Sequence, residues 1–224
     1  MARLGVFDII GPVMIGPSSS HTAGAVRIGR LARAISRGTP RKVKIWLHGS
    51  FARTYRGHGT DLALVAGLLG LDTGDERIKT AFDLAREKGL EFTIEPTDLG
   101  DVHPNTARLS VETAEGMTTV VTGSSIGGGN VVITEVDGFP VDLTGEYHTI
   151  VIHHHDEPGV VSRVTTVLAL DEVNIARMKT SRQRKEADAL MVIEVDQPGS
   201  PYVLPAITKL PQVRSAIMIE PVSL

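Results

Sequence analysis

The sequence predicts an α+β protein of two consecutive domains, covering residues 1–145 and 147–224. Apolar residues follow helical spacing through much of the first ninety or so positions, and they alternate with a period of two from residue 105 onward. Residues 147–224 then carry strands and helices in the order β-α-β-β-α-β, which is the split βαβ arrangement. A chain of 224 residues is long enough to bury a core in each of these domains.

The first domain begins with a helix, a strand and a loop. Residues 23–36 predict an amphipathic helix, with Arg27, Arg30, Arg33 and Arg37 largely outside its apolar face. Residues 43–47 predict a short strand. The glycine- and histidine-rich stretch that follows, up to residue 59, is expected to be a loop.

The remainder of this domain adds two helices and a set of strands. Thr60 or Asp61 can cap a helix whose apolar body is residues 62–69, and a further helix is expected at 75–88. Strands are then expected at 90–94, 106–113, 118–124 and 130–136, and turn chemistry at 137–140.

Predicted strands and helices alternate more regularly in the second domain. Its predicted strands are 149–153, 173–181, 189–195 and 213–219, and a charged hairpin covers 182–186. Its two helices run from the Pro158-Gly159 turn to residue 170 and over 201–210. The result is one antiparallel sheet with both helices on the same face.

Composition excludes several classes of function. Hydrophobic residues make up 42% and charged residues 22%, and the net charge of −3 offers no basic excess for nucleic acid. The longest apolar stretch is too short to cross a bilayer, and the apolar run before Asp8 is too short for a secretory leader. We therefore expect a soluble, cytoplasmic protein that binds neither nucleic acid nor membrane. With no cysteine, the chain cannot hold an iron–sulfur cluster through thiolates.

A run of hydroxyl side chains precedes the first helix. Gly16 and Pro17 shape a tight turn before Ser18, Ser19, Ser20, His21 and Thr22. Unpaired backbone N–H groups and the helix dipole favour an anion at such a place, so a small carboxylate is expected there. The alternative is that Ser19 or Ser20 only caps the helix.

Three histidine segments add further candidates. His58 lies between two glycines and suits proton transfer near neutral pH, although a surface histidine is an equally good interpretation. His103 opens a polar stretch before a strand, either as a turn or as the wall of a site. His153, His154 and His155 suggest a metallohydrolase, but adjacent strand residues point to opposite faces, so no metal site is expected.

Taken together, these motifs resemble the iron–sulfur-dependent L-serine dehydratases, most closely the beta subunit of the two-chain bacterial type. The resemblance covers essentially the whole chain and rests on residues 11–24, on Gly57-His58-Gly59-Thr60-Asp61 and on His103-Pro104-Asn105-Thr106. The first domain is also similar to the allosteric substrate-binding domain of some phosphoglycerate dehydrogenases. The second domain resembles the ferredoxin-like ACT domain, at residues 156–160 and 173–175.

This resemblance implies a lyase that converts L-serine to pyruvate and ammonia. By the resemblance, a base would remove the α-proton, and an iron of a [4Fe–4S] cluster would act as Lewis acid on the departing hydroxyl. Because this chain has no cysteine, the cluster is expected on a cysteine-containing alpha subunit. The rival interpretation is a stand-alone amino-acid sensor that binds serine without catalysis.

The resemblance also implies roles for individual residues. The substrate carboxylate would be held by Ser18, Ser19, Ser20 and Thr22, and proton transfer would fall to His58 in preference to His21. Further substrate contacts are expected from Gly59, Thr60, Asp61, His103, Asn105 and Thr106. In the ACT domain an effector would bind near Pro158, Gly159, Asn174 and Ile175, at a contact between two copies of the chain.

Overall fold

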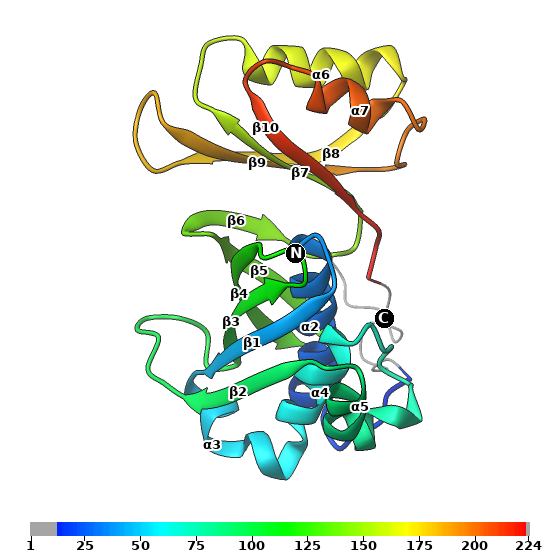
Figure 1. Cartoon of the computed structure of the whole chain (residues 1–224), viewed down its shortest axis with the longest axis vertical. Coiled ribbons are helices and arrows are strands. Elements are labelled where there is room, and N and C mark those ends of the chain that lie inside the picture. Colours follow the sequence, from blue (N-terminus) through cyan, green and yellow to red (C-terminus); the bar gives the residue numbers. More distant parts are fainter. Residues whose placement is uncertain (1–12, 223–224) are drawn as a thin grey trace, which may run out of the picture. The chain divides into compact units, whose positions relative to one another are not determined.

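The computed structural model describes residues 13–222, which divide into two compact units between Asp137 and Gly138 (Figure 1). Residues 1–10, considered above for a leader, and Gly11 and Pro12 of the serine motif lie outside this range. In the part of the chain that is described, no helix is long and apolar enough to span a membrane.

The first unit is built on a pair of tightly packed helices. A π-helical turn, η1 (Ser19–Ala23), leads into α2 (Gly24–Ile35), and α2 packs against α4 (Thr60–Leu68). A Cβ atom added to Gly67 would lie 2.1 Å from the carbonyl oxygen of Val26, and one added to Gly29 would lie 2.4 Å from that of Leu64. The two helices therefore touch backbone to backbone, which only glycine at these crossing positions permits.

A mixed sheet packs against α2. Its strand order is β2-β1-β3-β4-β5-β6, in which β6 follows Asp137 and so belongs to the second unit. Strands β1 and β2 pair in parallel, whereas β1 with β3, β3 with β4 and β4 with β5 pair antiparallel. Side chains alternate between buried and exposed along β1, where Val43, Ile45 and Leu47 are buried, as expected for a sheet with one covered face. The strands are β1 (Pro40–Leu47), β2 (Glu91–Pro96), β3 (Thr106–Thr113), β4 (Thr118–Gly127), β5 (Asn130–Val136) and β6 (Phe139–Leu143).

The expected loop before Gly59 is wrong, because Gly49–His58 forms the helix α3. Phe51 is its only fully buried side chain, so the segment lacks the apolar periodicity by which a helix is recognised in sequence. Gly59, in the left-handed conformation, ends α3 and begins α4.

Three smaller expectations were also wrong. Residues 137–140 do not form only a turn, since β6 begins at Phe139; Pro140 hid the alternation of its neighbours but is tolerated in a strand at the edge of a sheet. The single helix expected at 75–88 is a 3₁₀ turn, η2 (Glu76–Thr80), followed by α5 (Ala81–Glu87). Arg27 is buried, and its Nη1 donates to the carbonyl oxygen of Gly129 at 2.9 Å.

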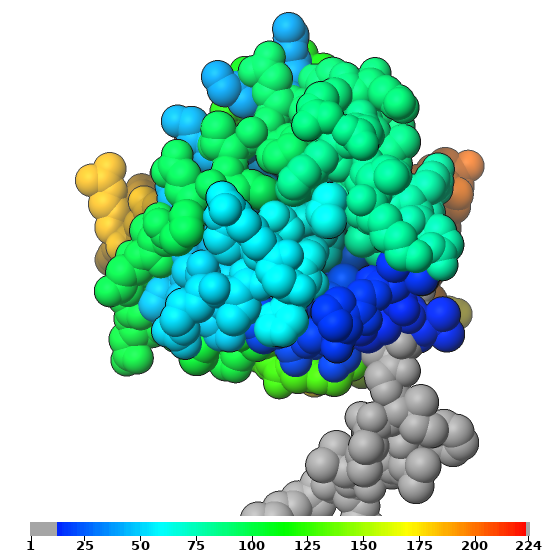
Figure 2. All heavy atoms as spheres, turned by 90° about the horizontal axis from the view of Figure 1, so that it is seen from below, coloured from blue at the N-terminus to red at the C-terminus, as the bar shows by residue number. Residues whose placement is uncertain are grey.

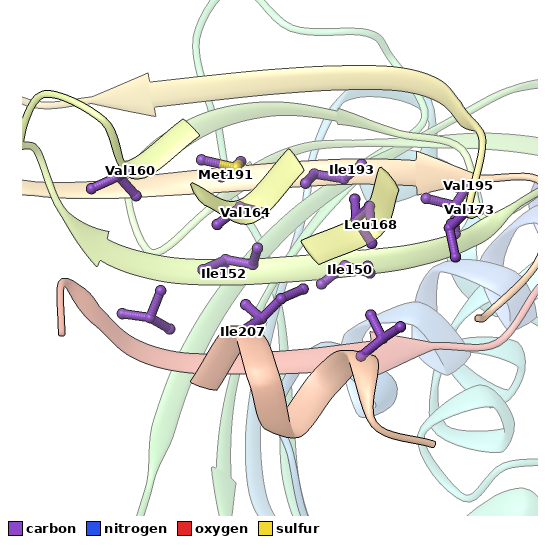
Figure 3. Close-up of a cluster of buried hydrophobic side chains, with 12 residues drawn as sticks. Ile150, Ile152, Val160, Val164, Leu168, Val173, Met191, Ile193, Val195 and Ile207 are labelled. Atoms are coloured by element: carbon purple, nitrogen blue, oxygen red, sulfur yellow. The ribbon is translucent and has the colours of Figure 1, made fainter. Parts of the chain in front are cut away.

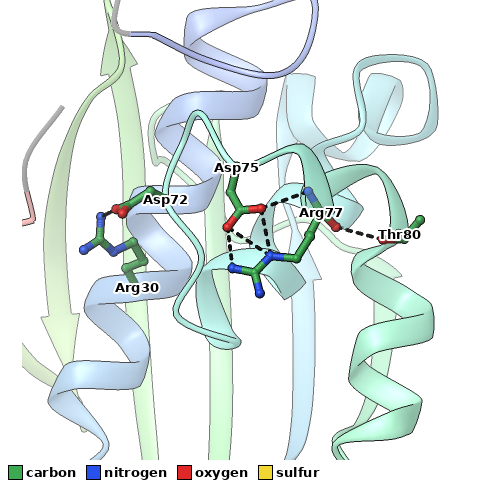
Figure 4. A network of polar contacts seen from close by, with 5 residues as sticks. All are labelled: Arg30, Asp72, Asp75, Arg77 and Thr80. Atoms are coloured by element: carbon green, nitrogen blue, oxygen red, sulfur yellow. Dashed lines mark hydrogen bonds and ion pairs between the residues drawn. The ribbon is translucent and has the colours of Figure 1, made fainter.

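Two aspartates organise the segment between α4 and α5 (Figure 4). Asp72 pairs with Arg30 of α2. Asp75 caps η2 by accepting the backbone N–H of Arg77 at 2.9 Å, and its carboxylate also receives the guanidinium of Arg77 at 2.6 Å. Hydrogen bonding from Arg77 lowers the pKa of Asp75 to about 2.

The second unit confirms the split βαβ prediction. Its sheet has the order β10-β7-β9-β8 and is antiparallel throughout. The core between this sheet and its helices includes Ile150, Ile152, Val164, Leu168 and Ile193 (Figure 3). The elements are β7 (His148–His155), α6 (Val160–Leu170), β8 (Ile175–Arg182), β9 (Asp188–Val195), α7 (Val203–Thr208) and β10 (Val213–Ile219).

The three consecutive histidines of β7 point to alternate faces of its sheet. His154 is buried, with its Nδ1 2.9 Å from the carbonyl oxygen of His155, while His153 packs edge-on against Phe139. Within residues 13–222, no group of three or more histidine, aspartate or glutamate side chains could hold a metal ion.

Candidate functional site

The serine motif forms the turn before α2. Ser18 caps this turn, because its hydroxyl accepts the backbone N–H of His21 at 3.2 Å and its carbonyl accepts that of Thr22 at 2.8 Å. The cap is thus Ser18, and neither Ser19 nor Ser20, the two serines expected as caps, makes a capping hydrogen bond to the described residues. The half-buried hydroxyls of Ser19 and Ser20 make no hydrogen bond to any of the residues described, which leaves them available to a ligand.

His21 is held at both ring nitrogens. Its Nδ1 lies 3.4 Å from the hydroxyl oxygen of Ser18, and its Nε2 lies 3.0 Å from that of Ser50. The ring of Phe51 packs edge-on against it with a centroid distance of 5.3 Å. Burial, together with the neighbouring His58, lowers the pKa of His21, so its imidazole is neutral at pH 7.

His58 stands beside His21 at the end of α3, with ring centroids 4.7 Å apart. Its Nδ1 is enclosed and has no hydrogen-bond partner among residues 13–222. The hydroxyl of Thr22 donates to the backbone carbonyl of His58 at 3.1 Å, which ties the serine turn to α3. The hydroxyl proton of Thr22 is therefore used within the chain.

The segment 103–106 supports the start of α3. The carbonyl oxygen of Pro104 accepts the backbone N–H groups of Ser50 at 2.7 Å and Phe51 at 3.3 Å, which satisfies donors that a helix start leaves free. His103 is exposed, and its Nδ1 accepts the N–H of Asn105 at 3.1 Å. Thr106 is fully buried, and its hydroxyl donates to the carbonyl oxygen of His103 at 2.6 Å.

The start of α4 brings polar groups into the interior. Thr60 is fully buried, and its hydroxyl has no hydrogen bond within the described chain. Asp61 is 9% exposed, its Oδ1 accepts the N–H of Leu62 at 2.9 Å, and burial raises the pKa of its carboxyl. In the sequence, Gly59 alone separates Thr60 and Asp61 from His58.

Figure 2 shows how these segments share one face of the first unit: the described N-terminal residues, in dark blue, lie beside α3, in cyan. The structure thus brings the serine turn and His58 together, and the 103–106 segment contacts the first turn of α3. Sequence reasoning missed Ser50 and Phe51, which contact His21. In the sequence, the only feature that indicates these two residues is their position shortly after a strand. A helix that starts there would point their side chains toward the site.

The four expected effector residues of the second unit do not converge within one chain. Pro158 and Gly159 precede α6, whereas Asn174 and Ile175 follow it. A helix of 11 residues separates the two pairs by about 16 Å. Asn174 donates through Nδ2 to Asp196 at 2.6 Å.

Comparison with known proteins gives two family matches. Residues 5–136 match the family described as serine dehydratase beta chain, and residues 148–212 match the ACT domain.

Individual relatives agree with these matches. A Bacillus subtilis (strain 168) protein named "Probable L-serine dehydratase, beta chain" is 48% identical over 93% of this chain and 94% of its own length. The "L-serine dehydratase, beta chain" of Peptoniphilus asaccharolyticus is 39% identical over 98% of this chain and all of its own. The D-3-phosphoglycerate dehydrogenase of Bacillus subtilis (strain 168) is 27% identical over 88% of this chain, which corresponds to 37% of that protein.

Proposed function

The chain belongs to the serine dehydratase beta-chain family, and from this premise we propose that it deaminates L-serine to pyruvate and ammonia together with an alpha subunit. The observation that carries the proposal is the contact between His21 and His58 beside two serine hydroxyls that lack partners in the described chain. A proton-transfer group thus lies next to a place that suits a carboxylate.

The carboxylate of serine binds to the hydroxyls of Ser19 and Ser20 at the start of the helical run. Backbone N–H groups at such a start favour negative charge. The hydroxyls of Ser18 and Thr22 are already engaged, by the His21 backbone and the His58 carbonyl. These two residues therefore fix the shape of the site instead of holding the substrate.

His58 accepts the α-proton of serine. Its Nδ1 is enclosed, which leaves Nε2 as the nitrogen that receives the proton. The neutral ring of His21 adds no positive charge beside it, because both ring nitrogens of His21 meet hydroxyl groups and burial lowers its pKa. His21 is thereby a positioning residue, held by Ser18 and Ser50.

The [4Fe–4S] cluster implied by the family resemblance does not fit this chain. The sequence contains no cysteine, and residues 13–222 hold no cluster of metal-ligating side chains. We therefore place the cluster on the alpha subunit, so that this chain supplies one wall of a shared site. The ACT domain acts as the regulatory part and pairs with a second copy through a sheet edge.

The test is reconstitution. The chain is used to capture its native partner, and the complex is analysed for iron and sulfide under anaerobic conditions. Serine deamination is expected for the assembled pair and not for this chain alone. Deamination by the isolated chain would exclude the shared site.

His58→Ala separates the enzyme from a stand-alone serine sensor. In the reconstituted pair this variant should abolish deamination, while calorimetry still detects serine binding to the complex. His155→Ala in the second unit is the matched control and should change neither property. A partner-free chain that binds serine and never supports deamination would favour the sensor.

A further inference from the structure

A pocket of about 310 Å³ lies in the second unit, on the sheet face opposite α6 and α7. The strand register pairs Arg177 with Glu194 and Lys179 with Val192, and the alternating residues Met191 and Ile193 belong to the core beneath the helices. The volume suits a small ligand. The pocket is lined by Asp142 of β6, by Arg177, Met178 and Lys179 of β8, and by Val192 and Glu194 of β9.

The floor of this pocket is an incompletely bonded carboxylate. The side chain of Glu194 is 1% exposed, and its Oε1 accepts both the N–H and the hydroxyl of Thr144, each at 3.2 Å. Its Oε2 is enclosed and receives no hydrogen bond from any described residue. Nη1 of Arg177 is 3.7 Å away, too far for a hydrogen bond, on a side chain that is 57% exposed. A buried carboxylate oxygen in this state favours an additional donor.

Cationic groups stand on the same face of β8. Arg177 and Lys179 are two residues apart and therefore point the same way, beside the buried carboxylate. A ligand with only a negative charge would be repelled by Glu194, and a ligand with only a positive charge would be repelled by Arg177 and Lys179. A ligand that carries both charges can pair with the carboxylate and with the two cationic side chains.

We propose that this pocket binds a small α-amino acid, with its ammonium group donating to Oε2 of Glu194 and its carboxylate facing Arg177 and Lys179. The four effector residues expected from the sequence lie elsewhere, at the two ends of α6, and none of them lines this pocket. The pocket is therefore a second ligand site of the ACT unit. It requires neither a second copy of the chain nor the alpha subunit.

The test is hydrogen exchange of the full chain with glycine, L-alanine or L-serine at millimolar concentration. At least one of these should slow exchange in segments 142–146, 177–181 and 190–195. Ethanolamine, which lacks the carboxylate, and lactate, which lacks the amine, should have little effect. Exchange changes around residues 18–24 report the serine turn separately, so failure here is distinguishable from failure of the proposed enzyme function.

Substitutions test the contacts individually. Glu194→Gln keeps the shape and an acceptor for Thr144 but removes the charge, and it should weaken amino-acid binding by about tenfold or more. Lys179→Gln on the surface should also weaken binding, whereas Lys185→Gln in the exposed hairpin should not. The proposal is overturned if no amino acid protects these segments, if ethanolamine protects them equally, or if Lys179→Gln and Glu194→Gln bind like the unmodified chain.

Discussion

The Nε2 atom of His21 lies 3.0 Å from the hydroxyl oxygen of Ser50, which joins the serine turn to the first turn of α3. On its other side, the ring meets Ser18. A neutral imidazole has one donor and one acceptor, so two hydroxyl partners can satisfy both nitrogens. The orientation of His21, and through it the position of His58, therefore depends on Ser50.

Ser50→Ala should lower kcat of the reconstituted pair by about fivefold, since one hydrogen bond contributes roughly 1 kcal/mol, and should leave KM for serine nearly unchanged. Steady-state kinetics measure both quantities. Thr54→Ala is the matched control, because among the described residues the Thr54 hydroxyl bonds only to the backbone carbonyl of Ser50 one turn away. A fall in kcat that Thr54→Ala reproduces would indicate general damage to α3.

Stability should decrease as the pH falls below 6.5, in part because of His21. Its pKa is lowered in the folded state, so the unfolded chain takes up the proton first as the pH falls. The loss begins near the unfolded value of about 6.5 and ends once the pH is below the folded pKa. Urea midpoints at several pH values, compared between the unmodified chain and His21→Gln, measure this contribution. Identical pH slopes would contradict it.

Gly29→Ala should destabilise the first unit by about 1–3 kcal/mol, because its Cβ would meet the Leu64 carbonyl at 2.4 Å and force α2 and α4 apart. Gly57→Ala, in α3, has no atom within 4 Å of the added Cβ and should be stabilising by roughly 0.4–1 kcal/mol. Urea denaturation followed by the fluorescence of Trp46, the single tryptophan, measures both. Equal effects of the two substitutions would refute the close helix contact.

Leu168→Ala should destabilise the second unit by about 2–5 kcal/mol, because the side chain is fully buried between α6 and its sheet. Leu170→Ala, two residues later, removes the same atoms from a side chain that is 82% exposed and should cost less than about 0.5 kcal/mol. Hydrogen exchange of β7 and β9 peptides reports the difference. Comparable losses would mean that α6 does not pack as described.

The sequence by itself determined most of the second unit. Strand alternation, the Pro158-Gly159 turn and the charged hairpin all agree with the observed βαββαβ order, because each is a local property of a short segment. The serine motif and the two histidine segments likewise identified the family before any contact was known.

Only the tertiary structure decided which of these residues meet and how. Periodicity failed for α3, which buries little besides Phe51, and so the sequence concealed that Ser50 begins a helix facing His21. The sequence likewise gives no sign of the role of Glu194, because its neighbours in β9 have the pattern of an ordinary buried strand. That one oxygen of its carboxylate lacks a hydrogen bond is known only once the positions of Thr144 and Arg177 relative to Glu194 are known. Whether a buried polar atom is hydrogen-bonded depends on its neighbours in three dimensions and not on the local sequence pattern.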